Sequence, residues 1–285
     1  MGGLCALLVV LIHCYVPSET WSGFWWFTEI VGGGEWLHGC FIRCAVPYFF
    51  LAAGFFLAGH VADGQGWWRR AVLKRCRTLV VPYLVWSTLA AVLVGTLMVV
   101  WKGESLTVGW FLRAFGVNPF SLPLLKQLWF LQSLFLLVFL SPILVRALSP
   151  MSLVVTAGLY LIYVLRPFEW PWQVYALFGL SCSLEGLLYF SLGMWLRLHP
   201  MKMPRRGTLL AIALPIFLAI AFAYAYCDGL GRSVAANLLK TVSVPRAMGV
   251  VWALTPACRW PRWLTQNAFP IFLLHLFPLI AIRRA

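Results

Sequence analysis

Charged residues are scarce in this chain, and acidic residues are the scarcest. Only 11% of its 285 residues are charged, with 8 Asp and Glu against 22 Lys and Arg, whereas 62% are hydrophobic. Soluble globular domains carry about a quarter charged residues, so a soluble globule is excluded. The apolar residues form many separate runs of about twenty residues, each long enough as a helix to cross a ~30 Å hydrocarbon core. The composition predicts a polytopic membrane protein.

The alternating polarity of membrane barrel strands is also missing, because stretches such as 84–100 and 209–225 are apolar on every face. We therefore expect an all-α membrane helix bundle with about nine transmembrane helices. The span 235–255 is the weakest, since Lys240, Pro245 and Arg246 interrupt it, and a broken or interfacial helix is the alternative. The expected spans are 3–16, 40–60, 78–101, 128–148, 152–165, 174–198, 207–227, 235–255 and 264–282.

A metal site or a disulfide framework is not indicated. The 8 cysteines include no CxxC pair and have no His-rich partner cluster, so we interpret them as small apolar residues. Histidine and carboxylate side chains do not cluster at ligand spacing either. We expect no metal.

Basic residues are divided unevenly among the connections. The segment 18–38 contains Glu19, Glu29 and Glu35 but no Lys or Arg, whereas the connection 61–77 has five basic residues against Asp63. The positive-inside rule then predicts a multi-pass protein with a cytoplasmic amino terminus. We expect it in the plasma membrane. The net charge of +14 reflects this topology and contact with anionic membrane lipid, and no nucleic-acid partner is expected.

Few titratable side chains lie inside the apolar runs, and each is therefore a candidate functional residue. His13 ends the apolar run 4–13, His275 lies in the late run 269–276, and Glu185 lies within an expected helix. For Glu185 the alternatives are a role in a polar interior and a structural hydrogen bond or ion pair. A structural hydrogen bond is favoured for His275, and spacing alone favours one for His13 too.

Two arginines are candidates for binding anions. Arg43 precedes Pro47, Phe50 and Gly54 at helical spacing, which places all four on one helical face. Its guanidinium suits phosphate or carboxylate, although it could also snorkel to the interface. Arg75 belongs to the basic run 69–77 at the mouth of a helix. That run would attract an anionic cytosolic substrate, or simply reflect topology and lipid headgroups.

An ordered set of motifs resembles the transmembrane acyltransferase family 3. The most specific is Arg43-Cys44-Ala45-Val46-Pro47-Tyr48-Phe49-Phe50-Leu51-Ala52-Ala53-Gly54-Phe55, which is similar to the family's Arg-x-x-x-Pro-x-Phe-Phe-x-x-(Ser/Ala)-Gly-(Phe/Tyr) stretch. Other segments look like the family's in the same order, namely 8–13, Arg75 through Pro82-Tyr83-Leu84-Val85-Trp86, Leu128-Trp129-Phe130-Leu131 and 269–275.

The resemblance implies a membrane-bound O-acyltransferase. It would move an acyl group, usually acetyl, from acyl-CoA to a hydroxyl of a cell-envelope carbohydrate such as a polysaccharide. His13 would act as general base or as a covalent acyl carrier, and Arg43 and Arg75 would bind anionic parts of the coenzyme. Glu185, Trp129 and His275 would be substrate-binding or structural polar residues.

Two departures from the family pattern affect this expectation. Gly2 stands where the family has a functional arginine, and the family usually continues for another helix beyond His275. We therefore expect residues 1–285 to form a single integral membrane domain clipped at both ends, with about nine of the family's roughly ten helices. The alternatives are a transporter or flippase of a sugar or lipid-linked substrate, and an inactive acyltransferase remnant.

Overall fold

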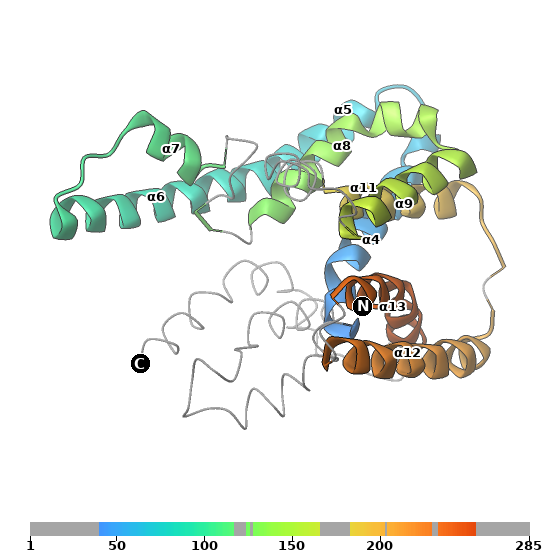
Figure 1. Cartoon of the computed structure of the whole chain (residues 1–285). Coiled ribbons are helices and arrows are strands. Elements are labelled where there is room, and N and C mark those ends of the chain that lie inside the picture. The colour runs from blue at the N-terminus through green and yellow to red at the C-terminus, as the bar shows by residue number, and fades with distance from the viewer. Residues whose placement is uncertain are drawn as a thin grey trace. The chain divides into compact units, whose positions relative to one another are not determined.

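The computed structural model describes residues 40–116, 124–125, 128–165, 183–202, 204–229 and 233–254. All regular elements in these ranges are helical (Figure 1). The predicted spans 3–16 and 264–282, with His13 and His275, lie outside the described residues. The elements are η3 (Ile42–Cys44), α4 (Ala45–Gly59), η4 (Val61–Asp63), α5 (Trp67–Arg75), η5 (Cys76–Val80), α6 (Val81–Lys102), α7 (Val108–Ala114), α8 (Trp129–Ala147), α9 (Pro150–Leu165), α11 (Leu184–Leu198), α12 (Arg206–Gly229) and α13 (Ser233–Leu254).

Several predicted helix boundaries are confirmed almost to the residue. The helices α8, α9 and α12 begin and end within one or two residues of the expected spans 128–148, 152–165 and 207–227. Helix α13 runs unbroken through Pro245, so the alternative of a broken helix is wrong. Its Lys240 ammonium lies 4.8 Å from the ring centroid of Tyr224, and Arg246 donates to the Val242 carbonyl oxygen of its own helix.

The membrane-spanning capacity is shown for three helical stretches in the described part of the chain. By length and composition, Trp67–Trp101, Trp129–Ala147 and Arg206–Tyr224 could cross a membrane, and Ala45–Gly59 and Pro150–Leu165 are shorter apolar helices. The chain is thus an all-helical membrane protein as far as the described residues go. The full set of nine spans stays a prediction.

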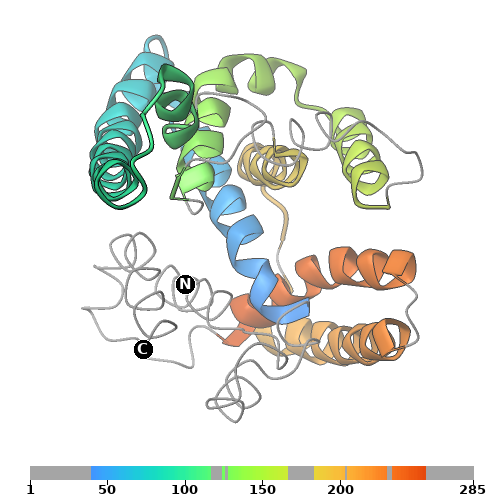
Figure 2. The same cartoon turned by 60° about the vertical axis from the view of Figure 1, so that its left-hand side comes forward.

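The chain divides into two compact units at Phe49 and Phe50, within α4. In the first unit α12 and α13 pack side by side (Figure 2). They run antiparallel, because Arg206 lies over Trp252 while Lys240 lies over Tyr224. The segment before α4 adds to this unit: Phe41 packs edge-on against Phe217, and Ser243 donates a hydrogen bond to the Cys40 carbonyl oxygen.

The second unit is centred on a close approach of α4 and α11. A Cβ atom at Gly54 would overlap the carbonyl group of Phe190, and one at Gly193 would overlap that of Leu51. Only glycine allows two helix backbones to come this near. Pro47, Phe50 and Gly54 are all buried, which confirms their predicted shared face. The prediction is wrong for its fourth member, because Arg43 is exposed and lies in η3, before α4 begins. Helices α8 and α9 pack on α11 around this contact.

The prediction that 61–77 is only a connection is wrong for its second half, because Trp67–Arg75 forms α5. Figure 1 shows α5 and α6 following one another along one helical path. The join is a π-helical turn, η5, in which the Val81 amide donates to the Cys76 carbonyl oxygen. Pro82 follows at the start of α6, and because proline lacks an amide hydrogen the regular α-helical bonding would be interrupted there in any case.

Candidate functional site

Helix α5 has two faces with different roles. Trp68 anchors it to α8: its indole N–H donates to the Phe139 carbonyl oxygen at 3.0 Å, and the two rings lie 5.7 Å apart. The cavity-lining side chains of α5 form an adjoining face at helical spacing: Trp67, Arg70, Ala71, Lys74 and Arg75. Arg75, seven residues after Trp68, lies at the edge of this face. This second face lines a cavity, so the α8 contact fixes which basic side chains of α5 reach it.

The cavity has a volume of about 560 Å³, which lies within the usual range for small-molecule sites. Its walls come from the end of α4, from η4 and from α5. Its lining has three permanent cations and one carboxylate, so it carries a positive charge. The lining residues are Phe56, Leu57, His60, Asp63, Trp67, Arg70, Ala71, Lys74 and Arg75.

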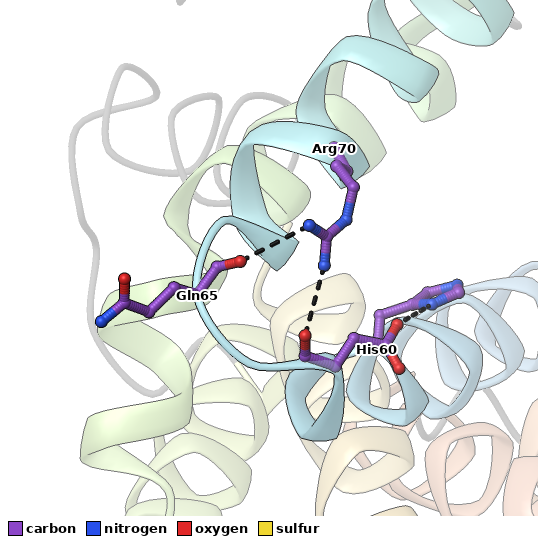
Figure 3. Close-up of polar contacts among 4 residues, drawn as sticks. His60, Gln65 and Arg70 are labelled. Atoms are coloured by element: carbon purple, nitrogen blue, oxygen red, sulfur yellow. Dashed lines mark hydrogen bonds and ion pairs between the residues drawn. The ribbon is translucent and has the colours of Figure 1, made fainter.

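A tight turn between α4 and α5 shapes this cavity (Figure 3). Gly64 and Gly66 have φ angles of 77° and 81°, in a region that glycine adopts without steric cost. The guanidinium of Arg70 donates to the carbonyl oxygens of Asp63 and Gln65, each at 3.4 Å. In the same turn His60 Nδ1 lies 2.9 Å from Asp63 Oδ2. Arg70 therefore serves mainly to hold the turn.

Arg75 and Lys74 are differently placed. Arg75 is half-buried and Lys74 is exposed. In the described part of the chain, neither side chain has a hydrogen-bond or ion-pair partner. A partly buried guanidinium without a counter-ion is costly unless a ligand supplies the negative charge. The predicted anion-binding residue Arg75 therefore lines a cavity with the charge and exposure that such a ligand needs.

The cavity lies at the end of a long helical path. Trp67–Trp101 contains 35 residues, which corresponds to about 52 Å of helix, whereas a hydrocarbon core is about 30 Å thick. The 22 residues of α6 suffice to span that core at roughly 33 Å. Because α5 carries the basic residues, we expect it to be the part that extends into the polar region of the membrane surface.

Glu185 lies at the start of a helix, in the first turn of α11. The expectation of a continuous helix over 174–198 is wrong at this point, since Ser183 precedes the helix as its N-cap and accepts a hydrogen bond from the Gly186 amide. A carboxylate is favoured in a first helical turn. Glu185 also accepts a hydrogen bond from the Tyr160 hydroxyl at 2.7 Å. This contact joins α9 to α11 and favours the structural interpretation.

Tyr160→Phe is expected to lower the free energy of unfolding by about 1.5–3 kcal/mol, because a hydrogen bond to a half-buried carboxylate is lost. Thermal unfolding in detergent would measure this. Tyr226→Phe is the matched control, since Tyr226 lies on α12 with 62% of its surface exposed. Equal melting temperatures for the two variants would contradict a structural role for the contact.

Trp129 begins α8 and packs against α4. Its ring lies 6.3 Å from that of Phe50, which also meets Phe130 edge-on at 4.8 Å. Phe50 in turn lies against Gly186, next to Glu185. From Phe50 to Gly59 at the end of α4 is roughly 14 Å of helix. Trp129 and Glu185 therefore both lie near Phe50 of α4, whereas the basic cavity lies at the carboxyl end of that helix.

Arg43 lies in η3, before α4 begins. It belongs to the first unit and Arg75 to the second. The roles proposed for Arg43 and for the two undescribed histidines, His13 and His275, stay predictions. In the described residues no group of three or more His, Cys, Asp or Glu could hold a metal ion.

Sequence reasoning missed the His60–Asp63 pair and the lining role of Trp67. The available signal was the spacing of His60 and Asp63, three residues apart directly after an apolar helix and before two glycines. That pattern is common in surface turns. Only the folding of α5 back toward the end of α4 gives the pair a cavity to line.

Comparison with known proteins supplies one match. The sequence model of the acyltransferase 3 family, described as an acyltransferase domain, matches residues 3–285. No curated protein and no solved structure gave a significant match. Because the family match covers nearly the whole sequence and three of the described helical stretches are long and apolar enough to cross a membrane, the chain belongs to the acyltransferase 3 family and is a membrane acyltransferase.

Proposed function

We propose that this protein is a membrane-bound O-acyltransferase of the plasma membrane. It transfers an acyl group, in the simplest case acetyl, from acyl-CoA to a hydroxyl of a cell-envelope carbohydrate. The family match supports acyl transfer in general. The choice of donor rests on one observation: the half-buried Arg75, which has no counter-ion among the described residues, lies beside Lys74 in a basic cavity.

The cavity suits a phosphate-bearing coenzyme in charge, in surface and in size. Arg75 and Lys74 offer donors for phosphate oxygens, and a guanidinium can bind two oxygens of one phosphate. Phe56, Leu57 and Trp67 add apolar surface to the same wall, where the uncharged parts of a coenzyme can lie. With α5 in the polar region of the membrane surface, this site would be open to a water-soluble donor.

In the proposed reaction the acceptor oxygen attacks the thioester carbonyl carbon. The carbon–oxygen bond forms as the carbon–sulfur bond breaks, and the coenzyme leaves as the thiolate. His13 would take the proton of the acceptor hydroxyl, or carry the acyl group covalently in a two-step transfer. This role comes from the family resemblance of the first segment. With a cytoplasmic amino terminus, the carboxyl end of α4 and the basic cavity would face the cytosol.

The direct test is transfer of radiolabelled acetyl from acetyl-CoA into cell-envelope glycans, using membranes that contain the chain. We expect covalent label with the parent and a loss to near background with His13→Ala, because the catalytic base or acyl carrier is removed. His199→Ala is the matched control, since His199 is exposed beyond the end of α11 and should leave the label unchanged.

Equal label in the parent and in His13→Ala would contradict the proposed role of His13. Movement of an unchanged sugar or lipid-linked solute, without covalent label, would instead indicate a transporter or flippase. Label that appears only after Gly2→Arg would indicate an inactive remnant that regains activity when the arginine of the family is restored.

A further inference from the structure

The cavity contains a histidine–carboxylate pair that the proposed donor binding does not yet use. His60 and Asp63 both line the cavity, and their side chains meet through His60 Nδ1 and Asp63 Oδ2 at 2.9 Å. The exposed fractions of the two side chains are 57% and 51%. A ligand in the cavity can therefore reach the pair directly, beside the cations of α5.

The pairing determines what the other ring nitrogen can do. An ionised carboxylate only accepts hydrogen bonds, so His60 Nδ1 must carry a hydrogen to bond with Asp63. In the neutral imidazole, Nε2 is then an acceptor with a lone pair. Phosphate oxygens are acceptors as well, so Nε2 of neutral His60 cannot form a hydrogen bond with them. Only a proton on Nε2 turns His60 into a donor toward phosphate.

The charged groups around His60 come from three elements. Asp63 of η4 bonds its ring, and Arg70, Lys74 and Arg75 of α5 line the same cavity. Arg197 of α11 adds a further cation, since its guanidinium carbon lies 5.3 Å from the ring centroid of Phe55 and its Nε would lie 3.4 Å from a Cβ at Gly59. A bound phosphate brings one to two negative charges among these cations, and an imidazolium beside it can donate a charge-assisted hydrogen bond to its oxygens.

We propose that a phosphate-bearing ligand binds in this cavity together with uptake of one proton from solvent at His60 Nε2. The ligand bridges the protonated imidazole and the cations of Lys74 and Arg75, while Asp63 holds the ring through Nδ1. The inference rests on the proposed function, because acyl-CoA is the phosphate-bearing ligand of that function. A membrane lipid with a phosphate monoester headgroup has the same chemistry.

The expected pH dependence has a definite sign. Histidine changes charge between about pH 5 and pH 8, and protonated His60 adds a charge-assisted hydrogen bond to the ligand. Affinity should therefore be highest at the acidic end of this range and fall as pH rises through it. A bond of this kind corresponds to about tenfold in affinity.

The test is the affinity for coenzyme A, measured by titration calorimetry on the full chain in phosphatidylcholine nanodiscs at about pH 6 and about pH 8. At the lower pH, we expect the parent to bind coenzyme A about tenfold more tightly than His60→Gln does. Glutamine keeps a neutral donor but does not titrate. Asp63→Asn should weaken the pH dependence and raise the affinity at the higher pH. It removes the carboxylate that fixes Nδ1, which is the one negative charge among the described lining residues.

The ionisation of the coenzyme's own phosphate affects the parent and every variant equally. The difference in pH dependence between the parent and His60→Gln therefore reports on His60 alone. Arg69→Gln, on α5 outside the cavity lining, should retain the parent's pH dependence. The same pH dependence in the parent and in His60→Gln would overturn the inference and leave the proposed donor standing. Absence of coenzyme binding by the parent at either pH would overturn both. Nanodiscs that contain phosphatidic acid distinguish the coenzyme from a lipid headgroup as the source of the bound phosphate. If coenzyme binding is lost in these nanodiscs, and the loss depends on His60, the proton-linked phosphate site stands and its ligand is the lipid.

Discussion

Gly54→Ala is expected to destabilise the protein by about 3 kcal/mol, because overpacking a close-packed interior costs about 1–3 kcal/mol and backbone atoms cannot rotate aside as side chains can. The added Cβ would overlap the carbonyl group of Phe190 on α11. Gly193→Ala should have a similar effect from the opposite helix, where the Cβ would overlap the carbonyl of Leu51. Either methyl group forces α4 and α11 apart.

Gly158→Ala provides the matched control for this prediction. Gly158 is also inside a helix, α9, and a Cβ atom there would meet no described atom within 4 Å. Alanine at such a position should stabilise the helix by about 0.5–1 kcal/mol. Thermal unfolding in one detergent would compare the melting temperatures of the three variants. If Gly54→Ala melts as high as Gly158→Ala, α4 and α11 do not pack at backbone distance.

Arg75→Gln is expected to raise the KM for the acyl donor by roughly 10- to 100-fold, which corresponds to the ~1.5–3 kcal/mol of a hydrogen bond to a charged group. Glutamine approximates the length of the arginine side chain but removes its charge. Lys74 then remains as the cavity-lining cation that has no protein partner among the described residues. If Arg75 acts only in binding, kcat at saturating donor should change little.

The control is Arg69→Gln, because Arg69 lies on the same helix but outside the cavity lining. A general attraction of the membrane surface for anions would be weakened equally by both substitutions and would be screened by salt. A local contact would be lost only with Arg75. Equal effects of the two variants would remove the case for a coenzyme site at Arg75.

The sequence predicted the long apolar helices well because their signal is local. In α8 and α12, hydrophobic residues fill consecutive turns, and length alone selects a helix that can span a membrane. The α4 face of Pro47, Phe50 and Gly54 was also predictable, since helical periodicity fixes which residues share a side. What lies opposite that face was not, because Phe190 is remote from Gly54 in the chain.

The helix α5 shows why charge misled the prediction. Four of its nine residues are Arg or Lys, so it looks like a cytoplasmic connection in a membrane chain. Its helical order comes from the contact of Trp68 with α8 and from continuity with α6 through η5. These are long-range contacts and a change in helical register, and neither leaves a pattern in the segment's own composition.

By itself, the sequence determined the all-helical membrane class, most helix boundaries on the described residues and the family, because hydropathy, periodicity and ordered motifs are properties of the linear chain. The tertiary structure alone decided that Glu185 bonds to Tyr160, that Gly54 meets a backbone carbonyl, and that His60 and Asp63 share a cavity with Arg75. Each of these depends on the packing of elements distant in sequence, and that packing sets the burial and the charges that a side chain meets.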